Sequence, residues 1–141
     1  ETKVNAECAT LISRMGPGED QIQAAIGLSS MATPALGAQY QSASQKPDAN
    51  AITLTGLATP NALKTYIKDD EHPMNAGMLW NCMDLGYLAV QVAYQLKNGD
   101  ITTESTSVNA GRLGTKEIAD SECVLGDALI FDKTNVDNFN Y

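Results

Sequence analysis

The sequence predicts an α/β fold built on a parallel sheet and followed by a C-terminal tail rich in short strands. Short apolar stretches typical of buried strands are each followed by a turn and a helical pattern, repeatedly up to residue 99. Units of this kind form parallel sheets with right-handed crossovers. After residue 99 the apolar pieces become short and are separated by glycines and acidic turns, as in edge strands or a ribbon.

The first helix is expected at residues 2–15, where apolar side chains recur at helical spacing. Gly16-Pro17-Gly18 ends it, and residues 22–28 form the first predicted strand. A loop then leads to a helix that opens with Thr33-Pro34, with Thr33 as the N-cap and Pro34 at the first helical position.

The same arrangement follows twice more. Residues 51–57 are predicted as a strand, Ala58 as its turn, and Thr59-Pro60 as the start of a helix that runs to about Lys68. Residues 76–81 are the third predicted strand. Asp84 is placed to cap a helix that continues to Asn98 and stops at Gly99. Its predicted apolar face comprises Leu85, Leu88, Ala89, Val92, Ala93 and Leu96.

Composition limits the classes of partner. The chain has 141 residues, 43% of them hydrophobic, which is enough for a globular core. Its formal net charge is −8, and its nine basic residues are scattered. Nucleic acids and anionic membranes require clustered Lys and Arg, so they are not expected as partners. A neutral ligand or another protein is expected instead.

No residue pattern predicts catalysis, a metal site or a cofactor. His72, the only histidine, lies in an acidic loop and is expected to be a solvated turn residue. No serine lies in a nucleophile-elbow motif, no phosphate-binding loop occurs, and no acid–base pair can be placed at the strand ends. The three cysteines lack metal or redox spacing and are expected to be small buried apolar residues.

The loops that follow the three predicted strands are the expected binding site. In parallel sheets these loops converge at one edge, beside helix N-termini whose free N–H groups can bind ligand oxygens. The loops are 28–31, 57–59 and 80–84. Trp80 could stack on a ligand ring or simply pack in the core, and Asn81 could bind hydroxyl groups or serve only as a turn residue.

Three stretches, in order along the chain, resemble periplasmic sugar-binding proteins of ABC importers. Residues 55–69 are similar to a strand–helix unit of their distal lobe, and residues 79–89 to the hinge strand and following helix of the rhamnose and autoinducer-2 branch. Residues 110–114 and 131–137 are similar to the C-terminal end of the proteins of the same branch.

The resemblance implies a parallel-sheet lobe of a two-lobed periplasmic-binding-protein fold. It implies a non-catalytic receptor, in the periplasm or at the cell surface, that binds a small sugar between two lobes and delivers it to a membrane permease. The implied ligand-binding positions are Leu28, Ser29, Ser30, Leu57, Ala58, Trp80, Asn81 and Asp84. Trp80 stands where the ribose branch has Gln, and loop 56–58 lacks that branch's Asp, so the rhamnose-like pattern fits best.

The same resemblance suggests how the chain is divided. Residues 1–80 would belong to the C-terminal ligand-binding lobe, residues 81–98 to the hinge and a helix returning to the N-terminal lobe, and residues 99–141 to a tail spanning the hinge. The rest of the N-terminal lobe, absent from this chain together with any signal sequence, is expected as a separate segment or from a swapped dimer. The alternative is the effector domain of a sugar-responsive transcription regulator, which would need a helix-turn-helix before residue 1.

Overall fold

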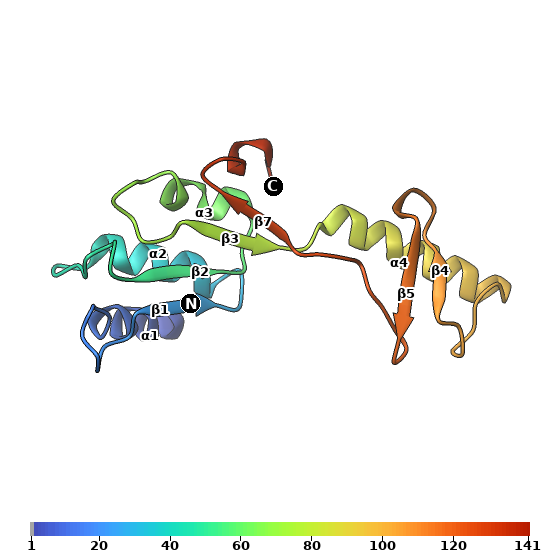
Figure 1. Ribbon diagram of the computed structural model, residues 1–141, viewed down its shortest axis with the longest axis horizontal. Coiled ribbons are helices and arrows are strands. Elements are labelled where there is room, and N and C mark those ends of the chain that lie inside the picture. The colour runs from blue at the N-terminus through green and yellow to red at the C-terminus, as the bar shows by residue number, and fades with distance from the viewer. Residues whose placement is uncertain (1) are drawn as a thin grey trace. The chain divides into compact units, whose positions relative to one another are not determined.

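A computed structural model describes residues 2–141, and the chain divides into two compact units (Figure 1). Unit 1 contains the residues up to Leu79 together with Ile130–Tyr141. Unit 2 is formed by Trp80–Leu129. The C-terminal segment therefore folds with the first half of the chain, although fifty residues of unit 2 separate them in the sequence.

Unit 1 contains the parallel sheet predicted from the sequence. β1 and β2 pair in parallel from Ala24↔Thr53 to Gly27↔Gly56, and parallel bridges at Leu54↔Met74 and Leu57↔Met78 join β2 to β3. β3 also pairs with β7, whose arrow points the opposite way in Figure 1. The elements of this unit are α1 (Thr2–Ser13), β1 (Ala24–Gly27), α2 (Ala32–Ser42), β2 (Thr53–Gly56), α3 (Pro60–Ile67), β3 (Ala76–Leu79), β7 (Leu129–Asp132) and the 3-10 helix η2 (Val136–Asn138).

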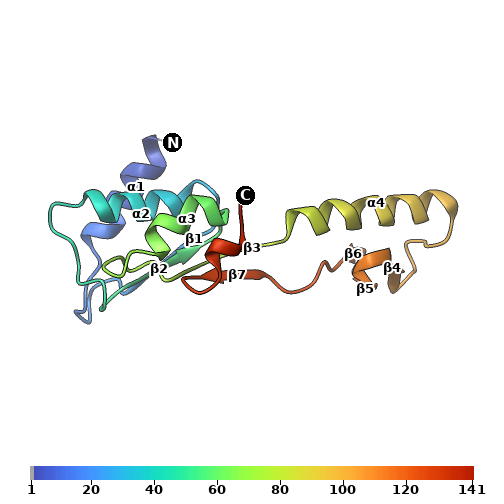
Figure 2. The same ribbon diagram turned by 90° about the horizontal axis from the view of Figure 1, so that it is seen from above.

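The core of unit 1 lies between the sheet and the three helices, which cover one face of it (Figure 2). Leu54, Leu63, Phe131 and Val136 are fully buried there. Packing at this face is tight, because a Cβ atom added at Gly77 would lie 2.6 Å from both Leu63 and Phe131. Val136 of the C-terminal segment is part of this core, so the returning segment completes unit 1.

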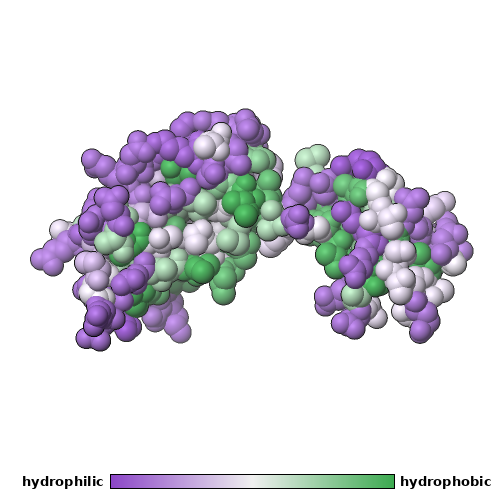
Figure 3. Space-filling model, in the orientation of Figure 1, coloured by the Kyte–Doolittle hydropathy of each residue, from purple (hydrophilic) through white to green (hydrophobic). Residues whose placement is uncertain are grey.

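The opposite face of the same sheet is uncovered. Alternate strand residues point to this side, and Ile26 and Ile130 are 59% and 61% exposed. Figure 3, which views the sheet from this side, shows hydrophobic and neutral residues across it. Parallel sheets are normally covered on both faces, so this unit exposes a surface that other sheets of its kind bury.

Unit 2 pairs one long helix with a small antiparallel sheet. Strand order is β4-β5-β6, and the β5–β6 turn uses positive φ angles at Asp120 and Ser121. The elements are α4 (Cys82–Asn98), β4 (Ser107–Asn109), the 3-10 helix η1 (Gly111–Leu113), β5 (Thr115–Ala119) and β6 (Glu122–Cys123).

The segment after residue 99, predicted as edge strands or a ribbon, also contributes to a second small core. Leu88 of α4 is buried with Ile101, Val108 and Ala110, and Val92 packs against them. α4 therefore packs one side against the short strands of the same unit, which gives unit 2 a small core.

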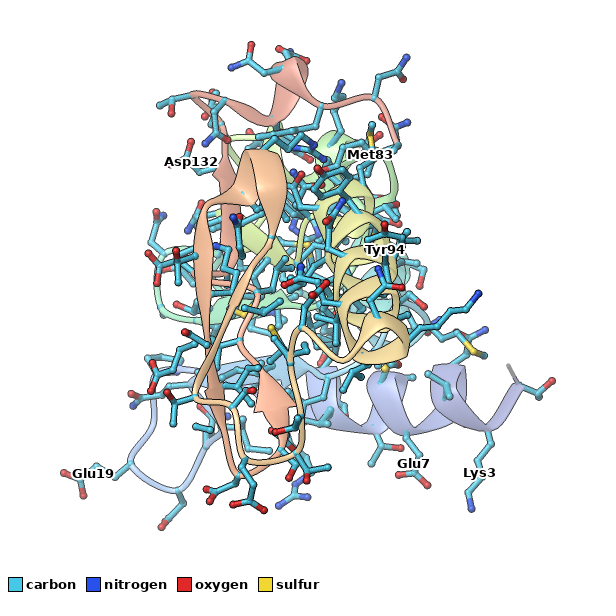
Figure 4. All side chains as sticks on the ribbon, turned by 90° about the vertical axis from the view of Figure 1, so that its right-hand side faces the viewer. Lys3, Glu7, Glu19, Met83, Tyr94 and Asp132 are labelled. Carbon is cyan, nitrogen blue, oxygen red and sulfur yellow. The ribbon has the colours of Figure 1, made fainter. Side chains whose placement is uncertain are left out.

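The other side of α4 is exposed. Met83 is 78% and Tyr94 63% exposed, with Val90 between them along the helix. In Figure 4 Met83 and Tyr94 lie on the side of α4 turned away from the orange strands. This outer face, formed by Met83, Gly86, Val90 and Tyr94, carries no charged residue.

Two helix caps differ from the predicted ones. α4 begins at Cys82, and its N-cap is Asn81, whose Oδ1 accepts the N–H groups of Met83 and Asp84 at 3.1 and 3.2 Å. The prediction of Asp84 as the cap is therefore wrong. α2 begins at Ala32, so Thr33 lies inside its first turn rather than at the cap position. The predicted stop of α4 at Gly99 is confirmed, because this residue has the left-handed φ of 77° that glycine adopts without strain.

Candidate functional site

In unit 1 the carboxyl ends of the three parallel strands meet at one edge. The N–H of Leu57 donates to the carbonyl oxygen of Gly27 at 2.8 Å, which ties the end of β2 to the end of β1. The N–H of Ala58 lies 3.4 Å from the carbonyl oxygen of Met78 in β3. The sequence therefore located the convergence of these strand ends correctly.

Loop 28–31 presents unpaired backbone donors at this edge. Within residues 2–141, the N–H groups of Leu28, Ser29 and Ser30 have no hydrogen-bond acceptor in the protein. The hydroxyl of Ser29 accepts the N–H of Ala32 at 3.1 Å, so it supports the start of α2. The partial positive charge of a helix N-terminus adds to these donors, and together they favour a ligand oxygen with free lone pairs.

Loop 57–59 is built differently. The N–H of Leu57 is bonded to Gly27, and its carbonyl oxygen accepts the hydroxyl of Thr33 at 2.8 Å. Ala58 is fully buried. The polar backbone groups of Leu57 are therefore engaged inside the protein, and this loop supports the edge more than it offers donors to a ligand.

The other three predicted site residues belong to unit 2. Trp80 is 45% exposed, so it is not the core residue that one reading of the sequence allowed. Asn81 uses its Oδ1 to cap α4, which leaves its side-chain N–H₂ as the group available to a ligand. Asp84 forms an ion pair of 2.6 Å with Arg112, whose guanidinium lies 4.6 Å from the centre of the Tyr87 ring.

Two open hollows lie beside predicted site residues, one in each unit. A hollow of about 400 Å³ in unit 1 is lined by Ser30 and Met31 together with Asn5 and Tyr66. A hollow of about 300 Å³ in unit 2 is lined by Asn81 and Asp84, and also by Lys116 and Asp127. Charged side chains of both signs line the second hollow.

His72 is buried, and the prediction of a solvated turn residue is wrong. Only 3% of it is exposed, and its ring lies between those of Tyr40 and Tyr66, at centroid distances of 4.9 and 5.0 Å. Nδ1 accepts the N–H of Met74 at 3.1 Å, so the proton is on Nε2, which lies 3.3 Å from the carbonyl oxygen of Gly37. Burial lowers the pKa of His72, outweighing the opposite effects of the Gly37 hydrogen bond and of Asp69. This neutral imidazole joins α2 and α3 to the start of β3.

The cysteines are not a uniform set. Cys8 is buried, and burial raises the pKa of its thiol, as expected for a small apolar residue. Cys82 is exposed, so the prediction of burial is wrong for it, and Cys123 is half-buried. No group of three metal-ligating side chains is found among residues 2–141, and no helix in this range is long and apolar enough to cross a membrane.

Thr33, Arg112 and Lys116 are the residues that the sequence reasoning missed at these places. Thr33 had been assigned only a capping role, yet its hydroxyl joins two strand ends. The signal that could have identified it is the pair Gly27 and Gly56, because glycines at the ends of adjacent strands mark close backbone approach. Arg112 and Lys116 are single basic residues in the tail, and no local pattern connects them to Asp84.

Three solved structures share this fold. A sugar ABC transporter protein from Actinomyces odontolyticus matches with a TM-score of 0.75 and 25% identity, over 99% of this chain and 43% of its own. LsrB from Clostridium saccharobutylicum, in complex with AI-2, matches with a TM-score of 0.75 and 22% identity, over 99% of this chain and 45% of the LsrB chain. An ABC transporter solute-binding protein from Clostridium phytofermentas with bound L-rhamnose matches with a TM-score of 0.77 and 23% identity, over 97% of this chain and 44% of its own chain. No protein-family model and no curated protein sequence matches the chain.

These matches confirm the resemblance and the fold class predicted from the sequence. The chain has the α/β fold of part of the sugar ABC-transporter binding proteins, and it spans less than half the length of the structures that it matches. The solved neighbours are binding and transport proteins rather than enzymes or transcription regulators.

Proposed function

We propose that this chain is part of the solute-binding receptor of a sugar ABC transporter. The receptor captures a small rhamnose-like sugar in a two-lobed structure outside the cytoplasm and delivers it to a membrane permease, without catalysis. The observation that carries the proposal is the edge of unit 1, where the N–H groups of Leu28, Ser29 and Ser30 lie beside a helix N-terminus without an acceptor among residues 2–141. This edge occurs in a fold whose solved examples include a protein with bound L-rhamnose.

A neutral sugar fits the chemistry of this edge. Sugar oxygens accept hydrogen bonds from backbone N–H groups. Separately, Trp80 of unit 2 exposes an indole on which a sugar ring can stack. The edge loops 28–31 and 57–59 contain no Lys or Arg, so they offer no counter-ion to a phosphate or carboxylate. The partial positive charge at the N-terminus of α2 then interacts with the partial negative charge of uncharged sugar oxygens.

The partner proposed for the chain is a further body of polypeptide that completes the two lobes. Two uncovered apolar surfaces support this: the bare sheet face with Ile26 and Ile130, and the outer face of α4 with Met83 and Tyr94. A separate segment with amphipathic helices would cover them, and a swapped second copy is the other possible source.

Calorimetric titration of the receptor with L-rhamnose, ribose, allose, xylose and autoinducer-2 tests the ligand. We expect L-rhamnose or a close analogue to bind with a Kd in the micromolar range, about −8 kcal/mol. Thermal shifts should follow the same order, since a ligand that binds only the folded state raises its stability. If none of the five raises the melting temperature or releases heat, the sugar-binding proposal is wrong.

Two substitutions test the proposed ligand contacts of unit 2. Trp80→Ala should weaken binding by about 1–3 kcal/mol through loss of ring stacking. Asn81→Asp keeps the oxygen that caps α4 and removes the side-chain donor, so it should weaken binding without unfolding the helix. Unchanged affinity in both variants would show that neither residue touches the ligand.

Sedimentation equilibrium tests the partner. Alone, the chain should self-associate at micromolar concentration, and a Val90→Lys change on the outer face of α4 should return it to a monomer. Glu7→Lys, an equally drastic change on the exposed side of α1, is the matched control and should leave association unchanged. A chain that is monomeric at high concentration without any partner would contradict the proposal.

A further inference from the structure

Thr33 occupies a buried position between the ends of two strands. It lies in the first turn of α2 and has no exposed surface. Its Oγ1 is 2.8 Å from the carbonyl oxygen of Leu57, 3.0 Å from that of Gly27 and 3.3 Å from that of Ser29. Because a hydroxyl has one proton, it donates to one of these oxygens at a time, and all three lie within its reach. One side chain thus joins loop 28–31 to loop 57–59.

Gly27 and Gly56 make room for this contact. They face each other in the register of β1 and β2. A Cβ atom at Gly27 would lie 2.3 Å from the Thr33 Oγ1, and one at Gly56 would lie 2.1 Å from the Gly27 carbonyl oxygen. Gly56 also has a φ of 148°, which other residues rarely adopt. The two glycines and Thr33 therefore form one packed unit with no space for adjustment.

This arrangement separates acceptors from donors at the ligand edge. The Gly27 and Leu57 carbonyl oxygens at the strand ends are engaged by Thr33 and by the Leu57 N–H. The N–H groups of Leu28, Ser29 and Ser30 stay without a protein acceptor in the range that the structure describes. Donors that the protein already holds in place bind ligand oxygens at a lower reorganisation cost.

We propose that Thr33 is the positioning residue of the ligand edge, which holds loop 28–31 against loop 57–59 so that the free N–H groups of loop 28–31 meet sugar oxygens in one fixed arrangement. This inference rests on the proposed sugar-binding function. Thr33 does not touch the ligand and acts only through the two loops. Its hydroxyl, rather than its bulk, is the active part.

Titration of L-rhamnose into the receptor and its Thr33→Val, Thr33→Ser and Thr55→Val variants tests this role. Thr33→Val keeps the shape and loses the donor, so affinity should fall by about tenfold or more, whereas Thr33→Ser should stay within about threefold of the unchanged protein. Thr55→Val removes a comparable bond, 2.9 Å from the Thr55 hydroxyl to the Ala76 carbonyl oxygen, in the middle of β2. It should lower stability without lowering affinity.

Amide hydrogen exchange gives a second measurement that needs no ligand. In Thr33→Val the exchange of the Leu57 N–H should accelerate by about tenfold or more, with no such change in Thr33→Ser. If the unchanged protein binds none of the five sugars, the proposed function fails, and the exchange data alone then decide the role of Thr33. If Thr33→Val binds L-rhamnose as well as the unchanged protein does, or if Thr55→Val weakens binding equally, the positioning role is wrong.

Discussion

The two units of this chain are stabilised in different ways. Unit 1 has a large core on one face of its sheet, and within residues 2–141 its buried side-chain N and O atoms, such as those of Thr33 and His72, all have hydrogen-bond partners. Unit 2 has a core of only four buried residues, formed by one helix and three short strands. The difference teaches that the proposed ligand edge belongs to the unit with the larger core, whereas α4 belongs to a unit that exposes much of its apolar surface.

The largest expected effect tests whether the returning segment completes unit 1. Phe131→Ala should lower the free energy of unfolding of unit 1 by about 3–5 kcal/mol, because the ring is fully buried against Leu63 and Gly77. Ile130→Ala, on the exposed face of the same strand, should change it by less than about 0.5 kcal/mol. Urea unfolding followed by circular dichroism measures both variants. Equal losses in the two would mean that the bare sheet face is in fact covered.

A second substitution tests whether unit 2 is stabilised separately. Leu88→Ala should cost about 2–4 kcal/mol in unit 2, since Leu88 is the residue of α4 buried in its small core. Val90→Ala, on the outer face of α4, should have little effect. Hydrogen exchange should then accelerate in β4 and β5 while the amides of β1 and β2 keep their protection. Acceleration of the same size in both units would remove the distinction between them.

The third prediction concerns the pH dependence of unit 1. The pKa of His72 is lowered in the folded state, so the unfolded chain, with a pKa of about 6.5, binds the proton first as the pH falls. Stability should be unaffected above this pH and should decrease below it, by at most about 1.4 kcal/mol per pH unit, until the folded ring is also protonated. Protonation of Nδ1 would break its bond with the Met74 N–H.

Urea unfolding between pH 7 and 5, with and without His72→Gln, checks this. The chain has no other histidine, so the slope should disappear in the variant. The charged and titratable groups around the ring are Tyr40 of α2, Tyr66 of α3, Lys46 of the loop before β2, and Asp69 and Glu71 of its own loop. A slope that persists in His72→Gln would show that the pH dependence does not come from His72.

The smallest expected effect is that of the Asp84–Arg112 ion pair in unit 2. More than half of the Arg112 side chain is exposed, so a double-mutant cycle with Asp84→Asn and Arg112→Met should give a coupling of about 0.2–1 kcal/mol. The coupling should decrease in high salt. A coupling above about 2 kcal/mol would show that the pair is shielded from solvent, as it would be beneath a partner body.

Much of the fold could be predicted because its signals are local. Apolar periodicity, Thr59-Pro60 at the start of α3 and Gly99 at the end of α4 depend only on neighbouring residues, and the structure agrees with each. The prediction of Asp84 as a cap failed because Asn81 and Asp84 are both good capping residues. The choice between them depends on where β3 ends. The strand ends at Leu79 rather than at the predicted residue 81, and the local sequence does not determine this boundary.

The candidate site was only half predictable for a similar reason. The convergence of loops 28–31 and 57–59 follows from parallel strand order, which the alternation of strands and helices implies. The carbonyl oxygen of Leu57 is engaged because it accepts the hydroxyl of Thr33, which lies 24 residues away in the sequence. No periodic pattern records such a contact.

By itself the sequence determined the order and kind of the elements, since backbone hydrogen bonding and the burial of one face are set by residues close together in the chain. Only the tertiary structure decided which polar groups are satisfied and which surfaces remain uncovered. His72 is buried because Tyr40 and Tyr66 close over it from two helices, and the outer face of α4 is exposed because the short strands cover only its other side. Both outcomes depend on distances between segments far apart in the chain, and packing alone sets those distances.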